Sequence, residues 1–438
     1  MKQIIRNKWM LGALAVMAGF TAVSCDDEPD KFKLTDGTPE IYYIRPASIE
    51  GADSLIVAGY LDNNICIVGE NLTSIKEIYF NDQQAIINTS YVTPNTMVIA
   101  IPGGIPEVVT NKIYMVNKSG VTTDYDFSVL VPGPSVRSIS CEWAKPGEEA
   151  TIQGDYFIDD PNVPLTITFA GNVELPAENI TSITKTAITF TVPDNWTEGY
   201  MNVQTIYGSS RSAFKFHDST NILFDWDGTR GGHASGYGWR NGVVHAPGTD
   251  EGVEAIDGSY LYFSGDLSGE VGATWAEDAF SFNYWPDESG ENGPLCDRPE
   301  FASLIADHGI DGLQMKFEMY VPSSNPWSSC AMQLIFSSMG QVSYATATNA
   351  YFSDTTVPRA LYNPWMATGS YDTADRWVTV SVPLNTFTYT HEGGACGAGF
   401  TAEMLAGLTF FVWNGGVAGT DCSPVILIDN IRVVPVEL

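Results

Sequence analysis

Short runs of β-branched and aromatic residues, separated by turn residues about every ten positions, extend along most of this chain. PEIYYIRPASI and TMVIAIPGG are typical of these runs, and Gly, Pro or Asn marks the turn after most of them. Helical periodicity is scarce, and FASLIADHG and AEMLAG are the only short candidates for helices. The pattern predicts that the chain folds as an all-β protein.

The first half of the chain contains two similar segments. Each has a strand followed by the pattern G-(E/D)-x-(L/F), at Gly69–Leu72 in the first copy and Gly154–Phe157 in the second. These segments resemble the IPT/TIG immunoglobulin-like module, which is a β-sandwich of about 90 residues. The resemblance implies two tandem sandwiches, at residues 39–131 and 132–218, with a short proline-containing joint between them.

The last segment, residues 219–438, has a different pattern. It opens with NILFDWDG, closes with VILIDNIRVVPVEL, and contains many short strands such as LQMKFEMYVP and RWVTVSVPL. A β pattern of this length is typical of one large sandwich. The predicted fold is therefore two immunoglobulin-like (IPT/TIG) β-sandwiches followed by a larger jelly-roll-like β-sandwich.

The N-terminus has the features of a targeting segment. A positively charged start and a short apolar run lead into AVSC, which ends at Cys25. This resembles the lipobox of bacterial lipoproteins, so residues 1–24 are predicted to be a signal peptide and Cys25 to carry lipid. Residues 25–38 form an acidic tether that begins CDDEPD and resembles the surface-export signal of Bacteroidetes lipoproteins. The expected location is the outer membrane, lipid-anchored and facing outward.

The balance of charge restricts the ligands. The chain has 21 Lys and Arg residues against 52 Asp and Glu residues, for a net charge of −31. Phosphate backbones need a basic surface, so nucleic acid is excluded as a partner and a neutral ligand is favoured.

Apart from Cys25 the chain has six cysteines, and none of them has the spacing of a metal site. Their spacing is equally compatible with disulfides and with free thiols.

Aromatic residues are concentrated in the last segment, which holds eight of the 11 tryptophans. Several lie in polar loop contexts such as GYGWRNG, NYWPDE and SSNPWSS, where an exposed ring could stack on a sugar while short polar groups bind its hydroxyls. Each could instead pack against its own loop. The predicted glycan-binding residues are Tyr284, Trp285, Trp239, Tyr237, Trp275, Trp327 and Trp365. The strand residues Trp226, Trp377 and Trp413 are interpreted as structural.

Tyr284 and Trp285 are the first candidates because they are adjacent. They precede Pro286 and a polar run, and neighbouring side chains on a strand point to opposite faces. At most one of the two rings could therefore enter a core there. We expect this pair to be exposed on a loop.

Acidic residues at both ends of the last segment suggest a metal site. Asp225 or Asp227 would lie on the first strand and Asp429 on the last, and these strands are commonly neighbours in jelly rolls. Oxygen-rich clusters of this kind bind Ca²⁺. The alternative is that these are solvated acids at strand ends.

No catalytic residue is predicted. A glycosidase needs two carboxylates in a set geometry, but no tight motif of spaced acids occurs in the last segment. The five histidines have no metal-ligand spacing, and no G-x-S-x-G elbow or P-loop is found. A surface glycoside hydrolase or lyase, and an adhesin or structural surface protein, remain alternative functions.

The whole arrangement resembles the surface glycan-binding protein B family of Bacteroidetes polysaccharide-utilisation loci. The resemblance implies a non-catalytic lipoprotein that needs no cofactor and binds a β-glucan, such as xyloglucan or mixed-linkage glucan. It also implies partners: an outer-membrane TonB-dependent transporter and its paired glycan-binding lipoprotein. Within the family pattern, Tyr284 and Trp285 match an adjacent aromatic pair, and Trp239 matches a separate ring. Some members have three immunoglobulin-like modules, whereas this sequence shows two.

Overall fold

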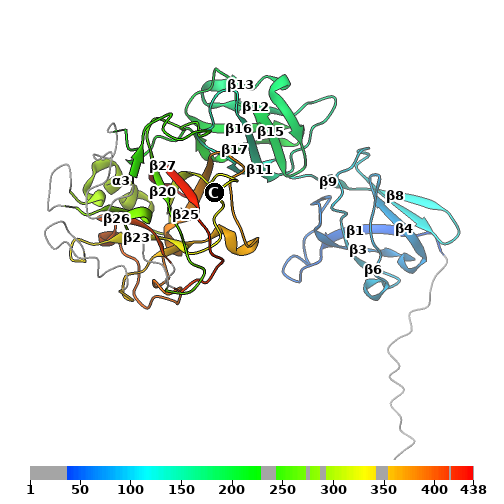
Figure 1. Cartoon of the computed structure of the whole chain (residues 1–438). Coiled ribbons are helices and arrows are strands. Elements are labelled where there is room, and N and C mark those ends of the chain that lie inside the picture. The colour runs from blue at the N-terminus through cyan, green and yellow to red at the C-terminus, as the bar shows by residue number, and fades with distance from the viewer. Residues whose placement is uncertain are drawn as a thin grey trace, which may run out of the picture. The chain divides into compact units, whose positions relative to one another are not determined.

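The structure is a computed structural model (Figure 1), which describes residues 37–227, 243–272, 277–286, 293–341, 354–413 and 416–437. Strands form nearly all of its regular structure, which confirms the all-β class. The two α-helices described are α2 (Glu277–Phe280) and α3 (Pro299–His308), and α3 contains the predicted FASLIADH helix. The AEMLAG segment forms only a 3-10 turn, at Ala402–Met404.

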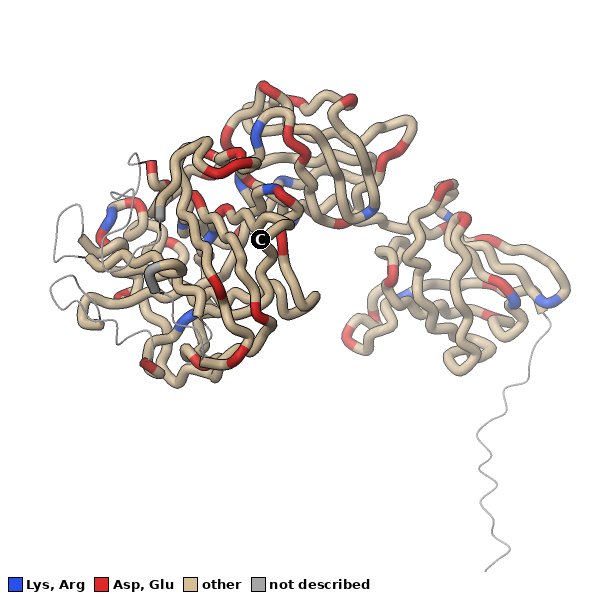
Figure 2. The backbone as a smooth tube through the Cα atoms, viewed as in Figure 1, with Lys and Arg blue, Asp and Glu red and all other residues tan. Residues whose placement is uncertain are grey.

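The chain divides into two compact units, residues up to Pro132 and residues from Gly133 onward. Figure 2 shows acidic residues spread over both units, as expected from the net charge. None of the helices in the described ranges is long and apolar enough to cross a membrane. Cys25 lies outside the described residues, and the six cysteines within them are free thiols.

The first unit is an immunoglobulin-like sandwich, called here the first sandwich. One sheet has the order β1-β3-β6, a second has the order β5-β4-β7-β8, and β2 pairs with β9. Alternating apolar residues of the two sheets, such as Ile67 and Ile113, meet in a core that belongs to this unit alone. Its strands are β1 (Glu40–Pro46), β2 (Ala58–Tyr60), β3 (Asn64–Glu70), β4 (Ile75–Phe80), β5 (Gln83–Gln84), β6 (Thr96–Ala100), β7 (Lys112–Asn117), β8 (Thr122–Asp126) and β9 (Ser128–Leu130).

The second unit begins with another immunoglobulin-like sandwich, the second sandwich. Its strands are hydrogen-bonded in the order β13-β12-β16-β17-β10-β11-β15-β14. They are β10 (Ser135–Ile139), β11 (Glu149–Asp155), β12 (Thr166–Phe169), β13 (Val173–Glu174), β14 (Ile180–Ile183), β15 (Ala187–Thr191), β16 (Gly199–Thr205) and β17 (Gly208–Phe216).

The two sandwiches repeat one local structure around the glycine of the G-(E/D)-x-(L/F) pattern. β1 pairs with β3, and β10 with β11, each antiparallel and each with a bulge near its start. A Cβ on Gly69 would lie 1.9 Å from the carbonyl oxygen of Glu40, and one on Gly154 would lie 1.9 Å from that of Ser135. Only glycine allows the strands to approach this closely, so the pattern marks a structural position.

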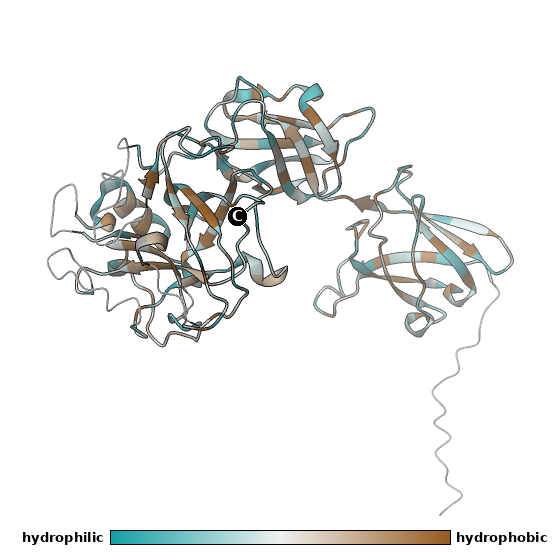
Figure 3. Cartoon of the chain, viewed as in Figure 1, coloured by the Kyte–Doolittle hydropathy of each residue, from teal (hydrophilic) through white to brown (hydrophobic). Residues whose placement is uncertain are grey.

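The second half of the unit is the C-terminal sandwich, which confirms the predicted jelly-roll-like layer structure. One sheet has the order β19-β20-β27-β22-β25, with β18 on β27, and the other has the order β21-β26-β23-β24. The first and last strands, β18 and β27, are paired as expected. Figure 3 shows the hydrophobic colour concentrated in strands, including β20 and β27. The strands are β18 (Ile222–Phe224), β19 (Val243–His245), β20 (Tyr260–Ser264), β21 (Ser281–Tyr284), β22 (Leu313–Tyr320), β23 (Ala331–Ser337), β24 (Ala360–Tyr362), β25 (Val378–Pro383), β26 (Gly407–Trp413) and β27 (Val425–Pro435).

The second sandwich and the C-terminal sandwich share one apolar core. Tyr320, Trp377 and Leu427 of the C-terminal sandwich belong to the same buried cluster as Ile152 and Phe190 of the second sandwich. The boundary expected near residue 218 is therefore not a boundary between compact units.

Buried charged groups also join these two sandwiches. Glu142 of the second sandwich accepts hydrogen bonds from Lys316 at 2.5 Å and from Arg432 at 2.7 Å. Arg432 also donates to Glu318 at 2.7 Å, and the Thr379 hydroxyl donates to Glu318 at 2.9 Å. We call these five residues the interface charge cluster. Because each buried charge has a partner on the other sandwich or beside it, separating the two would leave charges unpaired.

Candidate functional site

The expected exposure of the Tyr284–Trp285 pair is wrong. Tyr284 ends β21, lies fully buried in the main core of the C-terminal sandwich, and donates from its hydroxyl to the carbonyl of Gly293 at 2.7 Å. Trp285 is only 1% exposed and packs in a separate cluster. Strand alternation sends the two rings to opposite faces, so they cannot form one flat floor for a sugar chain.

Trp327 and Trp365 are also buried, contrary to the expectation of exposed loop rings. Trp327 donates its indole N–H to the carbonyl of Ser329 at 2.6 Å, and Trp365 donates to that of Cys330 at 2.9 Å. Both rings belong to the main core. Their loops fold back onto the sandwich, and backbone carbonyls satisfy the indole donors there.

Three predicted contacts, Tyr237, Trp239 and Trp275, lie outside the described residues and stay predictions. Trp226 and Trp377, interpreted as structural, are buried in apolar clusters. Trp413 is buried as well, but it lies away from the main core, in the small cluster that contains Trp285.

The predicted calcium site is wrong. No group of three or more His, Cys, Asp or Glu residues in the described ranges is placed to hold a metal ion, so Asp225, Asp227 and Asp429 do not form one. Asp227 instead accepts a hydrogen bond from the backbone N–H of Ser259. Burial raises the pKa of Asp429 well above its usual range.

One face of the sheet β21-β26-β23-β24 carries both aromatic and polar residues, and all of them are buried. Strand alternation places Phe282, Leu334 and Phe410 in the main core and their strand neighbours on the opposite face. We call that opposite face the Trp413 face. It consists of Ser281, Asn283, Trp285, Gln333, Ile335, Arg359, His391, Thr409, Phe411 and Trp413.

Stacked rings form one part of the Trp413 face. The Phe411 and Trp413 rings lie 6.0 Å apart at 18°, and the His391 and Trp413 rings lie 5.4 Å apart at 2°. Trp285 joins Phe411 and Trp413 in the same apolar cluster. These rings are nearly buried, with His391 7% and Trp413 9% exposed and Phe411 fully covered.

Hydrogen-bonding groups form the rest of this face. Asn283 accepts from the Thr409 hydroxyl at 2.9 Å and donates to Ser281 at 3.2 Å. Gln333 accepts from the Arg359 guanidinium at 2.8 Å and donates to the His391 carbonyl at 3.1 Å. Aromatic rings interspersed with a few amide and guanidinium groups are typical of a small-molecule or sugar site.

Tyr389 is an aromatic residue beside the Trp413 face that the sequence interpretation missed. Its ring is 42% exposed. Its backbone exchanges two hydrogen bonds of 3.0 Å with Arg359, and it lies two residues before His391. In the segment TYTHEGG this aromatic residue stands between two hydroxyl residues and before a glycine turn. That context indicates an exposed tyrosine, but the sequence interpretation considered mainly tryptophans.

The Trp413 face favours an uncharged ligand. None of the described residues that define it is a carboxylic acid. Burial lowers the pKa of His391, and the charge of Arg359 lowers it further, so this ring is neutral near pH 7. The Arg359 guanidinium is occupied by backbone carbonyls of Asp354 and Val357 as well as by Gln333. The residues of the face are at most 9% exposed, and Tyr389 is the exposed aromatic residue at its edge.

Known proteins are similar to this chain in both sequence and fold. A family model described as the surface glycan-binding protein B xyloglucan binding domain matches residues 216–435, half of the chain and all of the Trp413 face. An IPT/TIG domain-containing protein of Bacteroides ovatus is 29% identical over 224 residues, which are 48% of this chain and 44% of that protein. The chain therefore spans less than half the length of this curated relative.

A solved structure extends the match over nearly the whole chain. The surface glycan-binding protein SGBP-B from Prevotella bryantii has a TM-score of 0.75 and 35% sequence identity to this chain. The match covers 92% of this chain and 99% of that one, so it includes the immunoglobulin-like sandwiches as well as the C-terminal domain. By both its sequence and its fold, the chain belongs to the surface glycan-binding protein B family.

Proposed function

We propose that this chain is a non-catalytic cell-surface protein that captures a neutral polysaccharide of the β-glucan type, with xyloglucan or mixed-linkage glucan as the favoured ligands. One observation carries the proposal. The segment matched by the xyloglucan-binding family model contains a sheet face that combines stacked rings with hydroxyl, amide and guanidinium groups and has no carboxylate. The strongly negative net charge supports a neutral rather than an anionic polysaccharide.

Tyr389 and the Trp413–His391 stack are the proposed contacts at the described end of the site. Tyr389 is the exposed ring, while His391 and Trp413 are 7% and 9% exposed. The predicted rings Tyr237, Trp239 and Trp275 remain part of the proposal as further contacts. By analogy with base stacking, each ring contributes about 1–3 kcal/mol, which gives micromolar to millimolar binding after ordering costs.

The proposal includes the position of the protein in the cell. Lipid on Cys25 anchors the chain to the outer membrane, and the acidic segment 25–38 tethers it. The first sandwich acts as a spacer that holds the second unit away from the membrane. A TonB-dependent transporter and its paired glycan-binding lipoprotein receive the captured polysaccharide. Weak contacts suit this transfer, because several copies retain the polymer by avidity while each contact releases it readily.

Affinity electrophoresis in gels with soluble xyloglucan or mixed-linkage glucan tests the proposal. We expect the wild type to be retarded without shortening the polymer, Tyr389→Ala to lose most of the retardation, and Tyr389→Phe to retain it because the ring remains. Tyr91→Ala is the matched control, since Tyr91 is an exposed tyrosine of the first sandwich. A wild-type protein that no neutral glycan retards would contradict the function. Unchanged retardation of Tyr389→Ala would contradict the site alone.

A further inference from the structure

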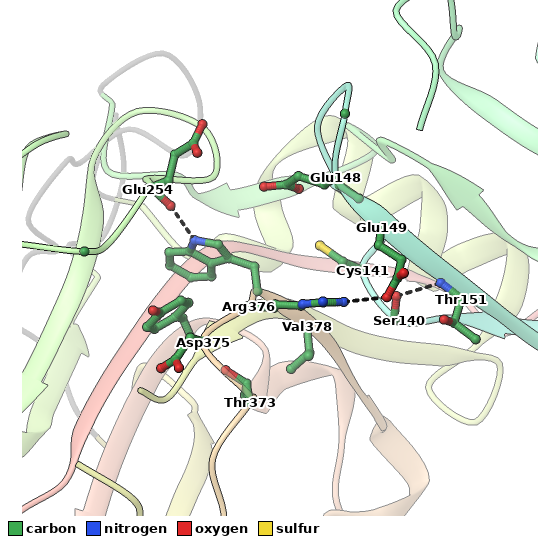
Figure 4. Close-up of a pocket in the computed structure, with 15 residues that line it drawn as sticks. Ser140, Cys141, Glu148, Glu149, Thr151, Glu254, Thr373, Asp375, Arg376 and Val378 are labelled. Carbon is green, nitrogen blue, oxygen red and sulfur yellow. Dashed lines mark hydrogen bonds and ion pairs between the residues drawn. The ribbon is translucent and has the colours of Figure 1, made fainter. Parts of the chain in front are cut away.

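A groove lies between the second sandwich and the C-terminal sandwich, away from the Trp413 face. Its larger part has a volume of about 660 Å³, with Ser140, Glu148 and Thr151 on one wall and Glu254, Arg376 and Val378 on the other. Figure 4 shows this part, with Ser140, Cys141 and Glu148 from the second sandwich near Val378 and Arg376.

The groove continues along the C-terminal sandwich. A second hollow of about 530 Å³ is lined by Ser323, Ser324 and Asn325. Both hollows are lined by Gly252, Tyr320 and Asp375, so the two hollows adjoin. Each volume is within the range of about 300–1,000 Å³ that is common for ligand sites.

The walls of this groove are fixed before any ligand arrives. The interface charge cluster and the shared core lie behind it, and the backbone N–H of Thr379 donates to the Ser140 carbonyl at 2.9 Å. Across the groove, Arg376 forms an ion pair with Glu149 at 2.8 Å (Figure 4). A preformed groove binds with little loss of conformational entropy in the protein.

The chemistry of the lining fits a neutral, hydroxyl-rich ligand. The rings of Tyr320 and Trp377 lie 5.6 Å apart and form the apolar part of the larger hollow. Glu148 and Glu254 on opposite walls are strong acceptors for ligand hydroxyls. The one guanidinium that lines the described groove, that of Arg376, is already paired with Glu149. Glu254 pairs with Lys145 at 3.3 Å, whereas Glu148 and Asp375 accept from backbone N–H groups, so an anionic sugar would meet negative charge there.

We propose that this groove is a second glycan-binding site, which takes a neutral oligosaccharide segment across both hollows. It is separate from the Trp413 face and rests on the proposed function only for the class of ligand. Because one site is on the sheet face and the other is between two sandwiches, one protein would hold a polymer at two points. Release from one site would then leave the polymer bound at the other.

Filling the groove tests this proposal. Ser140 is exposed on one wall of the larger hollow, and Ser324 is exposed in the second hollow. Ser140→Trp and Ser324→Trp each place a ring in a different part of the groove. Val163→Trp is the matched control, because Val163 is an exposed valine of the second sandwich that does not line either hollow.

Titration calorimetry with a xyloglucan heptasaccharide measures the number of sites on the full-length protein. We expect two binding events in the wild type and in Val163→Trp, and at least a tenfold weaker second event in both groove variants. Tyr389→Ala should lose the other event and keep the groove event. Hydrogen exchange should show ligand protection of residues 373–378 in the wild type that disappears in Ser324→Trp.

The outcomes separate the two sites. One binding event in the wild type, lost in Tyr389→Ala and unchanged in both groove variants, would overturn the groove while leaving the proposed function intact. No binding by the wild type would overturn both. Loss of the second event in Ser324→Trp with an unchanged unfolding temperature would support the groove even if Ser140→Trp does not fold.

Discussion

The two immunoglobulin-like sandwiches share a local structure but differ in what they pack against. Both have a glycine at the bulged strand pair, and both place the third residue of the pattern, Asn71 or Tyr156, in a left-handed conformation. The first sandwich has its own core and forms a separate compact unit. The second shares its core and buried charges with the C-terminal sandwich. One fold thus acts as an independent module in the first case and as part of the binding unit in the second.

Because of this difference, only the first sandwich can be a spacer that is independent of the binding unit. The described residues of the first sandwich include most of the large apolar side chains that are exposed, such as Ile49 and Ile86, and none of its described carboxylates is buried. The second sandwich instead contributes Glu142 to a cluster that contains two cations of the C-terminal sandwich. Damage to the second sandwich should therefore reach the glycan sites, and damage to the first should not.

The largest expected effect comes from Glu142→Gln. The change leaves Lys316 buried without its carboxylate partner and weakens the contacts of Arg432, so the second unit should lose about 3–5 kcal/mol of unfolding free energy. The matched change in the first sandwich is Lys112→Met, which removes partly exposed ion pairs to Asp124 and Asp126. Lys112→Met should leave stability unchanged. Scanning calorimetry of the two units measures both effects, and equal effects would contradict the distinction between the sandwiches.

The paired glycines give a smaller but more closely matched comparison. Gly69→Ala and Gly154→Ala each force a methyl group against a backbone carbonyl, at a cost of about 1–3 kcal/mol. We expect the two changes to destabilise their own units similarly. Near the unfolding temperature of the variant, only Gly154→Ala should reduce retardation in xyloglucan gels. If Gly69→Ala reduced it equally, the first sandwich would be part of the binding unit.

The smallest expected effect is a dependence on pH that is confined to the second unit. Burial raises the folded-state pKa of Asp429 above the value of about 4 for an unfolded chain. Between those two values the folded state binds more protons, so the free energy of unfolding should fall as the pH rises through the folded pKa. Asp429→Asn keeps an oxygen acceptor for the N–H of Asn430 and removes the buried acid.

We therefore expect Asp429→Asn to stabilise the second unit at pH 7 and to reduce its pH dependence. Calorimetric scans at pH 5 and pH 8 would detect the change, with the transition of the first unit as the internal reference. A transition of the second unit that does not move with pH in the wild type would refute the role assigned to Asp429.

Sequence reasoning predicted the layers well and the exposure of the loop aromatic residues poorly. Strand runs, turn residues and the repeated glycine pattern are local features, and they indicated the tandem sandwiches and the larger C-terminal one. The polar loop context of Trp327 and Trp365 suggested exposure, but these loops fold onto the core and bury both rings. The adjacency of Tyr284 and Trp285 suggested a common surface, whereas the strand places them on opposite faces. Tyr389 was missed because its neighbours on the face come from distant parts of the chain.

The sequence alone determined the all-β class, the internal repeat, the acidic character and the family pattern, because periodicity, turn chemistry and charge depend on neighbouring residues or on composition. Only the tertiary structure decided which rings are buried, and that Gln333, Arg359, His391 and Trp413 share a face. It also decided that the second sandwich is joined to the C-terminal one through Glu142. Burial and pairing across sandwiches depend on strand register and packing between distant segments, which no local pattern encodes.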